Sequence, residues 1–213
     1  MKLSNALEDL GIRPQDLQVI TLATDGYSAA KHRLLAICMA NRVENLDDIR
    51  PEYQMICGGD VEATKDVTGI LPLTYRLEAQ PPEVTRQWFL DRLTPTTVLA
   101  GHSVCRFTRP FLEQLLGGPT DEHVAGFFDT QIIGRAAMGG RLADGLDESA
   151  TLAMAQAKMS KLAMPAKLPK SLEAMCENYQ LGLEYPGWPM APWQKACRTM
   201  ALLNRLLDEE LAP

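Results

Sequence analysis

The chain has 213 residues, of which 46% are hydrophobic and 23% charged, a composition ordinary for a globular protein with a buried core. Its 21 basic and 27 acidic residues give a net charge of −6, which argues against broad non-specific binding of nucleic acid, because that binding depends on neutralising phosphates. No apolar run reaches about 18 residues and the first residues include acids, so we expect no transmembrane helix, no signal peptide and a cytoplasmic protein.

The first part of the chain predicts a short helix followed by three strands. Residues 3–10 have a helical pattern, which Gly11 and Pro14 end. Apolar and β-branched runs then predict strands over 17–23, 33–41 and 53–59. Because the links between them are short and polar, we expect an antiparallel meander.

Helices and strands alternate in the middle of the chain. Apolar residues at helical spacing predict helices over 81–93, 109–117 and 130–138, and short apolar runs predict buried strands over 94–103 and 123–130. The order is therefore a meander followed by helix, strand, helix, strand and helix.

The segment 139–170 differs in composition, because it is rich in Ala, Met and Lys and has no aromatic residue. It predicts a helix over 148–162 and then a mobile, proline-containing link. Its acid-free end carries Lys158, Lys161, Lys167 and Lys170. These lysines either contact phosphate or an acidic partner, or form a solvated helix face.

The last part of the chain predicts a short helix over 171–181, a loop over 184–192 and a long amphipathic helix over 193–211. The five cysteines are scattered without a closely spaced pair, and the three histidines add no ligand pattern, so no zinc site is predicted. Cys38 and Cys57 lie in apolar runs, and we expect both to be buried thiols.

Several short motifs follow one another along the chain. They are T-L-A-T-D-G at 21–26, T-G-I at 68–70, A-G-H-S-V-C-R-F-T-R-P-F-L at 100–112, F-D-T at 128–130, S-L at 171–172 with Cys176, and W-Q-K-A-C-R-T at 193–199. In this order they resemble the motifs of the DnaQ-like, DEDD-type 3′–5′ exonucleases, which have the ribonuclease H-like fold.

The resemblance implies an α/β domain over 17–213, with a mixed sheet in which three antiparallel strands lead into parallel ones and helices flank the sheet. Residues 1–16 are then an N-terminal helical extension, and 139–170 is a helical insertion.

In that family, four carboxylates hold two divalent cations such as Mg²⁺, which activate water, and a general base assists. Matched motif by motif, the carboxylate positions of the first strand fall on Thr21 and Ala23, that after the central strand on Thr108, and the histidine and acid of the last helix on Trp193 and Arg198. Threonine supplies no charge, alanine no oxygen, and arginine repels a cation. With all these positions substituted, we expect no metal ion or other cofactor.

The resemblance and the substitutions together imply a catalytically inactive, exonuclease-like protein that binds or scaffolds in DNA or RNA metabolism. The residual cleft is expected to contain Thr24, Asp25, Gly26, His102, Ser103 and Phe107 beside the substituted positions. Trp193 is expected to plug the cleft or stack on a base, and Arg198 to bind phosphate or pair with Asp25. The expected ligand is a protein partner or, despite the net acidity, a single-stranded nucleic acid, and no membrane is expected. The sequence does not set the oligomeric state.

Two alternatives stay open. The chain is a divergent exonuclease that binds Mg²⁺ or Mn²⁺ through displaced acids such as Asp25 and Asp129, or it is a structural subunit that docks through 139–170. In the simpler interpretation, Asp25 supports its own turn and Asp129 caps a helix. His102 and Ser103 either touch a ligand or tie a strand end to its neighbours.

Overall fold

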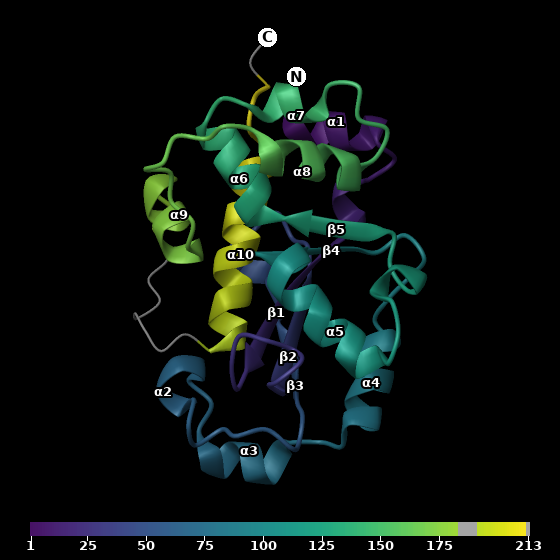
Figure 1. Cartoon of the computed structure of the whole chain (residues 1–213), viewed down its shortest axis with the longest axis vertical. Helices are drawn as coiled ribbons and strands as arrows, with labels where there is room; N and C mark the ends of the chain where they lie inside the picture. The colour runs from purple at the N-terminus through teal and green to yellow at the C-terminus, as the bar shows by residue number, and fades with distance from the viewer. Residues whose placement is uncertain (183–190, 212–213) are drawn as a thin grey trace.

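A five-stranded mixed sheet forms the centre of the molecule (Figure 1). The computed structural model describes residues 1–182 and 191–211. The strands are β1 (Leu17–Thr24), β2 (Leu34–Asn41), β3 (Glu52–Met55), β4 (Val98–Gly101) and β5 (Gly126–Asp129), in the spatial order β3-β2-β1-β4-β5. β2 pairs antiparallel with β1 and β3, whereas β4 pairs parallel with β1 and β5. The predicted mixed sheet, and with it the fold class, is confirmed.

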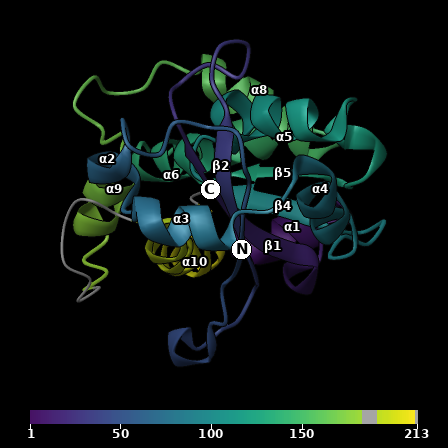
Figure 2. The ribbon, with the colours of Figure 1, turned by 90° about the horizontal axis from the view of Figure 1, so that it is seen from below.

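Helices cover both faces of this sheet. They are α1 (Leu3–Asp9), α2 (Lys65–Thr68), α3 (Pro72–Glu78), α4 (Pro82–Leu90), α5 (Arg109–Leu116), α6 (Thr130–Met138), α7 (Leu142–Leu146), α8 (Leu152–Lys161), α9 (Leu172–Asn178) and α10 (Pro192–Leu207), with a π-helical turn, η3 (Val104–Thr108), before α5. Short 3-10 turns occur at Pro14–Asp16, Leu46–Asp48 and Thr120–Glu122. Figure 2 shows α9 and α10 on one side of the strands and α4 on the other.

The alternation of side chains along β1 explains the two larger hydrophobic cores. Leu17 and Val19 face a core shared with α1, α6, α8, α9 and α10, whereas Ile20 and Leu22 face a core shared with α4 and α5. Successive strand residues point to opposite faces, and helices on both faces bury both sets. Thr21 also lies on the α10 side, where its hydroxyl reaches the first residue of that helix.

The segment 139–170 is packed into the fold. The helix predicted over 148–162 is confirmed as Leu152–Lys161, and its Leu152, Ala155 and Met159 belong to the core on the α10 side. The buried Gln156 fixes it to β5, because its Oε1 accepts a hydrogen bond from the amide of Asp129 at 2.6 Å and its Nε2 donates to the carbonyl of Phe127 at 2.7 Å. The inner face of α8 is therefore occupied by the sheet.

Some elements differ from the sequence-based expectation. β3 ends at Met55 rather than at residue 59, and the short helices α2, α3 and α7 had not been predicted. α3 exposes Leu73 and Leu77 at 69% and 76%, so its apolar pattern does not mark a buried face. The loop predicted over 184–192 lies almost wholly outside the described residues. In the part of the chain that is described, no helix is both long and apolar enough to cross a membrane.

Candidate functional site

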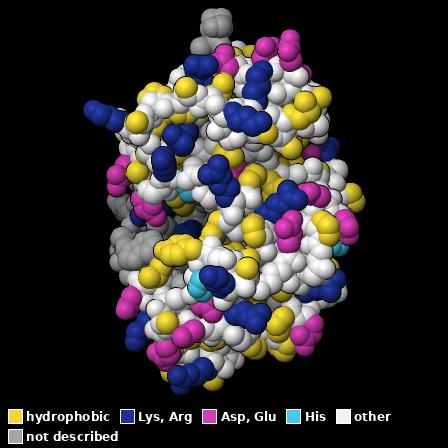
Figure 3. Space-filling view, in the orientation of Figure 1, with side chains coloured by type: hydrophobic (Ala, Val, Ile, Leu, Met, Phe, Trp, Pro, Cys, Tyr) yellow, Lys and Arg dark blue, Asp and Glu magenta, His cyan; other side chains and the backbone are white. Residues whose placement is uncertain are grey.

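A pocket of about 550 Å³ opens at the carboxyl ends of the neighbouring parallel strands β1 and β4. Ligands of open α/β sheets bind at this edge, because loops leave both strands there. One wall consists of residues 20–27 from β1 and the turn after it, of His102, Ser103, Phe107 and Thr108 from η3 and the turn before it, and of Thr64, Val67 and Thr68 from α2 and its N-cap. The opposite wall consists of Gln131, Lys170 to Glu173, Lys195 and Thr199. In Figure 3 the face is hollowed beside α9 and α10, and Lys and Arg side chains gather over the half that holds α6, α8 and α9.

Three buried threonines give this pocket a neutral, hydroxyl-lined base. Thr21, Thr108 and Thr199 are exposed by only 7%, 3% and 0%. Thr21 Oγ1 donates a hydrogen bond to the carbonyl oxygen of Pro192 at 2.7 Å. The hydroxyl of Thr199 has no hydrogen-bond partner among the described residues, so it could donate a hydrogen bond to a ligand or accept one from it.

Lys195 contributes a positive charge to the same wall. It lies one helical turn before Thr199 on α10, so both side chains point into the pocket. Burial lowers the pKa of Lys195 below the ordinary lysine value, and the carboxylate of Glu173 opposes this shift. Lys195 is thus the basic side chain that α10 contributes to this wall.

His102 connects the end of β4 to the rim of the pocket. Its Nε2 lies 2.7 Å from the carbonyl oxygen of Lys170, so this nitrogen carries the proton and donates it, and its Nδ1 lies 3.3 Å from the hydroxyl of Thr130. Burial lowers the pKa of His102, while the carbonyl of Lys170 and the charges of Asp129 and Glu173 act in the opposite direction. His102 therefore lines the pocket and also ties the strand end to its neighbours.

The two acids considered as displaced metal ligands are each held by backbone amides. Asp25 lines the pocket, but its Oδ1 accepts from the amide of Arg33 at 2.5 Å and its Oδ2 from that of Asp60 at 3.0 Å. These bonds fasten the turn after β1 to the loop after β3, as the turn-supporting interpretation expects.

Asp129 is 1% exposed and accepts from four amides, those of Ser103, Cys105, Gln131 and Ile132, at 3.0 to 3.3 Å. The last two open α6, so the interpretation of Asp129 as a helix cap is confirmed. Asp129 lies outside the lining of the main pocket.

The placement of Trp193 and Arg198 in the cleft is corrected by the structure. Neither lines the pocket: the Trp193 ring packs on Tyr53 with centroids 5.4 Å apart, and the carbonyl of Arg198 accepts from the thiol of Cys176 on α9. Among the described residues, Asp25 is paired with amides rather than with Arg198. Trp193 and Arg198 are five residues apart on α10, so their side chains differ in direction by roughly 140° and do not share one face. The side chains of Lys195 and Thr199, four residues apart, differ by only roughly 40°.

Sequence reasoning missed Lys195, Thr199, Val67 and Glu173 as lining residues. The spacing of Lys195 and Thr199 by four, beside the buried Ala196 and Met200, was a signal that these two share one face of α10. Of the four lysines of 158–170, only Lys170 reaches the pocket, and Lys158 Nζ donates to the carbonyl of Asp147 instead.

The residues at the base of the pocket do not fit two divalent cations. Beside hydroxyls, the methyl group of Ala23 and the amino group of Lys195, the pocket has the carboxylates of Asp25 and Glu173. Both oxygens of Asp25 already accept backbone amides, whereas a pair of Mg²⁺ ions requires several free anionic oxygen ligands. Within residues 1–182 and 191–211, no group of three His, Cys, Asp or Glu side chains is close enough to hold a metal ion.

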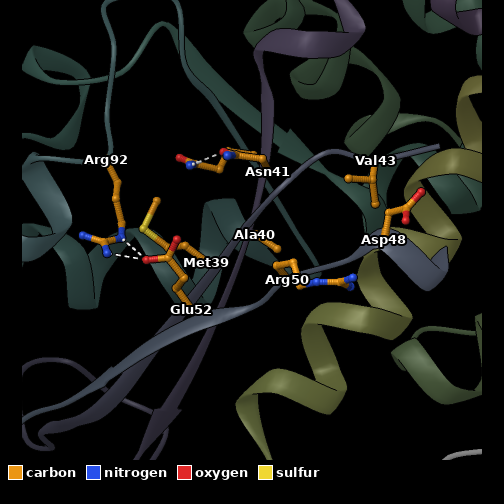
Figure 4. A pocket seen from close by; sticks show the side chains of 9 residues that line it. Met39, Ala40, Asn41, Val43, Asp48, Arg50, Glu52 and Arg92 are labelled. Carbon is orange, nitrogen blue, oxygen red and sulfur yellow. Dashed lines mark hydrogen bonds and ion pairs between the residues drawn. The ribbon is translucent and has the colours of Figure 1, made fainter. Parts of the chain in front are cut away.

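A second cavity, of about 350 Å³, lies at the opposite edge of the sheet, where β1 begins and β2 ends (Figure 4). Arg92 pairs there with Glu52, and Arg50 donates to the carbonyls of Asp47 and Ile49. Because these cations are already engaged, this cavity is a weaker candidate for an anionic ligand.

No protein-family model matches the sequence, and no curated protein matches it either. Among solved structures, the chain is similar to Escherichia coli exonuclease I in complex with a dT13 oligonucleotide, with a TM-score of 0.65, 14% identity, and coverage of 91% of this chain and 41% of that one. It is also similar to the zinc-bound exonuclease I–ssDNA complex, with a TM-score of 0.64, 17% identity, and coverage of 90% and 42%. The chain therefore spans less than half the length of these proteins, and it has the ribonuclease H-like fold of the DnaQ-type exonucleases.

Proposed function

We propose that the chain is an exonuclease-like protein that holds the end of a single-stranded nucleic acid in the pocket beside β1 without cleaving it. The observation that carries the proposal is the composition of the pocket base. Thr21, Thr108 and Thr199 supply uncharged hydroxyls, and Lys195 supplies a cation of the protein itself. The lining has two lysines, Lys170 and Lys195, and two acids, Asp25 and Glu173, of which Asp25 is engaged with backbone amides. The lysines are therefore the groups that would attract an anionic ligand.

The walls of the pocket suit a base and the sugar-phosphate attached to it. Tyr27 stands at the mouth with 88% of its surface exposed, and Phe107, Val67 and Leu172 give further apolar wall. Aromatic side chains stack on any base, and cations next to them contact the phosphate. Lys170 and Lys195 lie on the opposite wall, and the pocket is within the size range of small-molecule sites.

The proposal is tested by fluorescence anisotropy with a labelled linear oligothymidylate, with its RNA counterpart, and with circular single-stranded DNA as competitor. We expect the linear oligonucleotide to bind and the circle, which has no end, to compete poorly. Tyr27→Ala is expected to weaken binding roughly tenfold, because stacking on an aromatic ring is worth about 1–3 kcal/mol, whereas Tyr27→Phe keeps the ring and the affinity. Lys195→Met weakens binding, and Lys2→Met at the far end of the molecule is its matched control.

The same oligonucleotide, incubated with Mg²⁺ or Mn²⁺, is expected to keep its length. If an activity that shortens the oligonucleotide co-purifies with the chain and is lost in the Asp25→Asn variant, the divergent exonuclease would be favoured instead. Equal binding of circular and linear DNA, or unchanged binding by both pocket variants, would contradict the proposed end-binding pocket.

A further inference from the structure

A small cavity of about 160 Å³ lies between η3, α6 and α8. Its lining is Arg106, Asp129, Gln131, Ile132, Arg135, Met159, Ser160, Leu162 and Met164. Gln131 lines the main pocket as well, so the two cavities are neighbours that share a wall. Arg106 projects from η3, whose Phe107 and Thr108 face the main pocket.

Two arginines, Arg106 and Arg135, line this cavity. In the part of the chain that is described, neither Arg106 nor Arg135 takes part in an ion pair or a side-chain hydrogen bond, whereas Arg92, Arg109 and Arg141 all do. The Nε of Arg135 is fully buried and has no hydrogen-bond partner there. A buried donor without an acceptor is unfavourable, and a ligand oxygen in the cavity would remove that deficit.

Asp129 is the carboxylate of this lining, and its oxygens already accept the four amides of Ser103, Cys105, Gln131 and Ile132. Both arginines therefore remain available to an external anion, and the cavity has a net positive charge. Ser160 adds a hydroxyl, which donates to the carbonyl of Ala157 at 2.8 Å and keeps its lone pairs for a further donor.

The dimensions of the cavity select the class of anion. Its volume is well below the roughly 300 Å³ at which sites for whole small-molecule ligands begin. Met159, Leu162 and Met164 close its α8 side with apolar surface. Guanidinium groups match the oxygens of tetrahedral oxyanions in pairs of hydrogen bonds, so a phosphate group satisfies both the size and the charge.

We propose that this cavity binds a phosphate group through Arg106 and Arg135. The phosphate is either free inorganic phosphate or a backbone phosphate of the strand whose end occupies the main pocket. The second source rests on the proposed function, and the shared wall at Gln131 places that strand next to the arginines.

The test measures the binding of inorganic phosphate by calorimetry and of the labelled oligothymidylate by anisotropy, on the full chain. The variants are Arg106→Gln and Arg135→Gln, with Arg86→Gln on the exposed side of α4 as a control of equal charge change. We expect phosphate binding in the wild type and in Arg86→Gln, and its loss in the two cavity variants. Each cavity variant is expected to weaken oligonucleotide binding about tenfold and to reduce the salt dependence, expressed as the slope of log K against log salt, by about 1.

The outcomes separate this inference from the proposed function. If phosphate binds in an arginine-dependent way but the oligonucleotide does not bind the wild type, the cavity takes free phosphate and the proposed end-binding function is wrong. If the oligonucleotide binds equally to all arginine variants and phosphate does not bind, the inference is overturned while the end-binding pocket stands. Should Arg135→Gln fail to fold, the exposed Arg106→Gln and the conservative Arg135→Lys decide the question, because lysine keeps the charge but not the paired hydrogen bonds.

Discussion

The hydroxyl of Thr21 on β1 donates a hydrogen bond of 2.7 Å to the main-chain carbonyl oxygen of Pro192, the first residue of α10. The bond joins residues 171 positions apart and is buried. An ionised carboxylate at this position could only accept, and would face the carbonyl oxygen instead. The position that the exonuclease resemblance assigns to a metal ligand thus fastens the last helix to the sheet.

This relationship predicts the effect of Thr21→Val. The substitution keeps the shape of the side chain but leaves the carbonyl of Pro192 without its donor, so we expect the free energy of unfolding to fall by about 1–3 kcal/mol. Urea denaturation followed by circular dichroism measures the change. Thr74→Val on α3 is the control, because the hydroxyl of Thr74 makes no hydrogen bond to any residue that the structure describes, and it should change stability by less than about 0.5 kcal/mol. Equal stability of Thr21→Val and the wild type would show that the bond does not hold α10.

Asp129→Asn is expected to destabilise the fold more than a surface substitution does. The amide group removes the charge and turns one acceptor oxygen into a donor that faces backbone N–H groups, so the loss should exceed about 2 kcal/mol. Thermal unfolding of this variant beside Asp66→Asn, an exposed change of equal chemistry on α2, measures the difference. A melting temperature equal to that of Asp66→Asn would contradict the role of Asp129 as the common acceptor.

His102 predicts a loss of stability in mild acid. Burial lowers the pKa of His102 in the folded chain below its ordinary value of 6.5, so the unfolded chain binds the proton more readily. The contribution of His102 to the free energy of unfolding is therefore complete above pH 6.5, and it is lost as the pH falls toward the lowered pKa of the folded state. Unfolding free energies of the wild type and His102→Gln across this range, with an NMR titration of the ring, test it. The acid-dependent loss should be smaller in the variant, and a ring that titrates above 6.5 would reverse the sign.

The cysteines predict one thiol that reacts quickly. Cys57 is exposed, contrary to the expectation that it is buried, because β3 ends two residues before it. Burial raises the pKa of Cys38 and of Cys105 to about 12 and that of Cys176 to about 11, which disfavours their reactive thiolates. A thiol-reactive disulfide reagent should therefore show one fast phase in the native protein, and Cys57→Ser should remove it. A fast phase that persists in Cys57→Ser would place the reactive thiol elsewhere.

The local patterns of the sequence were sufficient for the central strands, and the motif resemblance supplied the fold class. β1 and β2 are mostly apolar because helices bury both of their faces, and the same burial gives α5 and α6 their periodic apolar residues. α2 and α3 were not predicted because they are short. In addition, α3 exposes Leu73 and Leu77, so its apolar residues do not mark a buried face.

The residues of the site likewise fall into those that the sequence predicted and those that only the tertiary structure placed there. The motif resemblance located at the pocket residues that do line it, namely Thr21, Ala23, Thr24, Asp25, Gly26, His102, Ser103, Phe107 and Thr108. These residues lie at strand ends and in the turns after them, which short motifs can identify. Which face of α10 meets them depends on how the helix is rotated when it docks, and the docking is decided by contacts such as that between Thr21 and Pro192, far apart in the chain. Only the tertiary structure could therefore replace Trp193 and Arg198 by Lys195 and Thr199, and only it could bring Arg106 and Arg135 into one cavity.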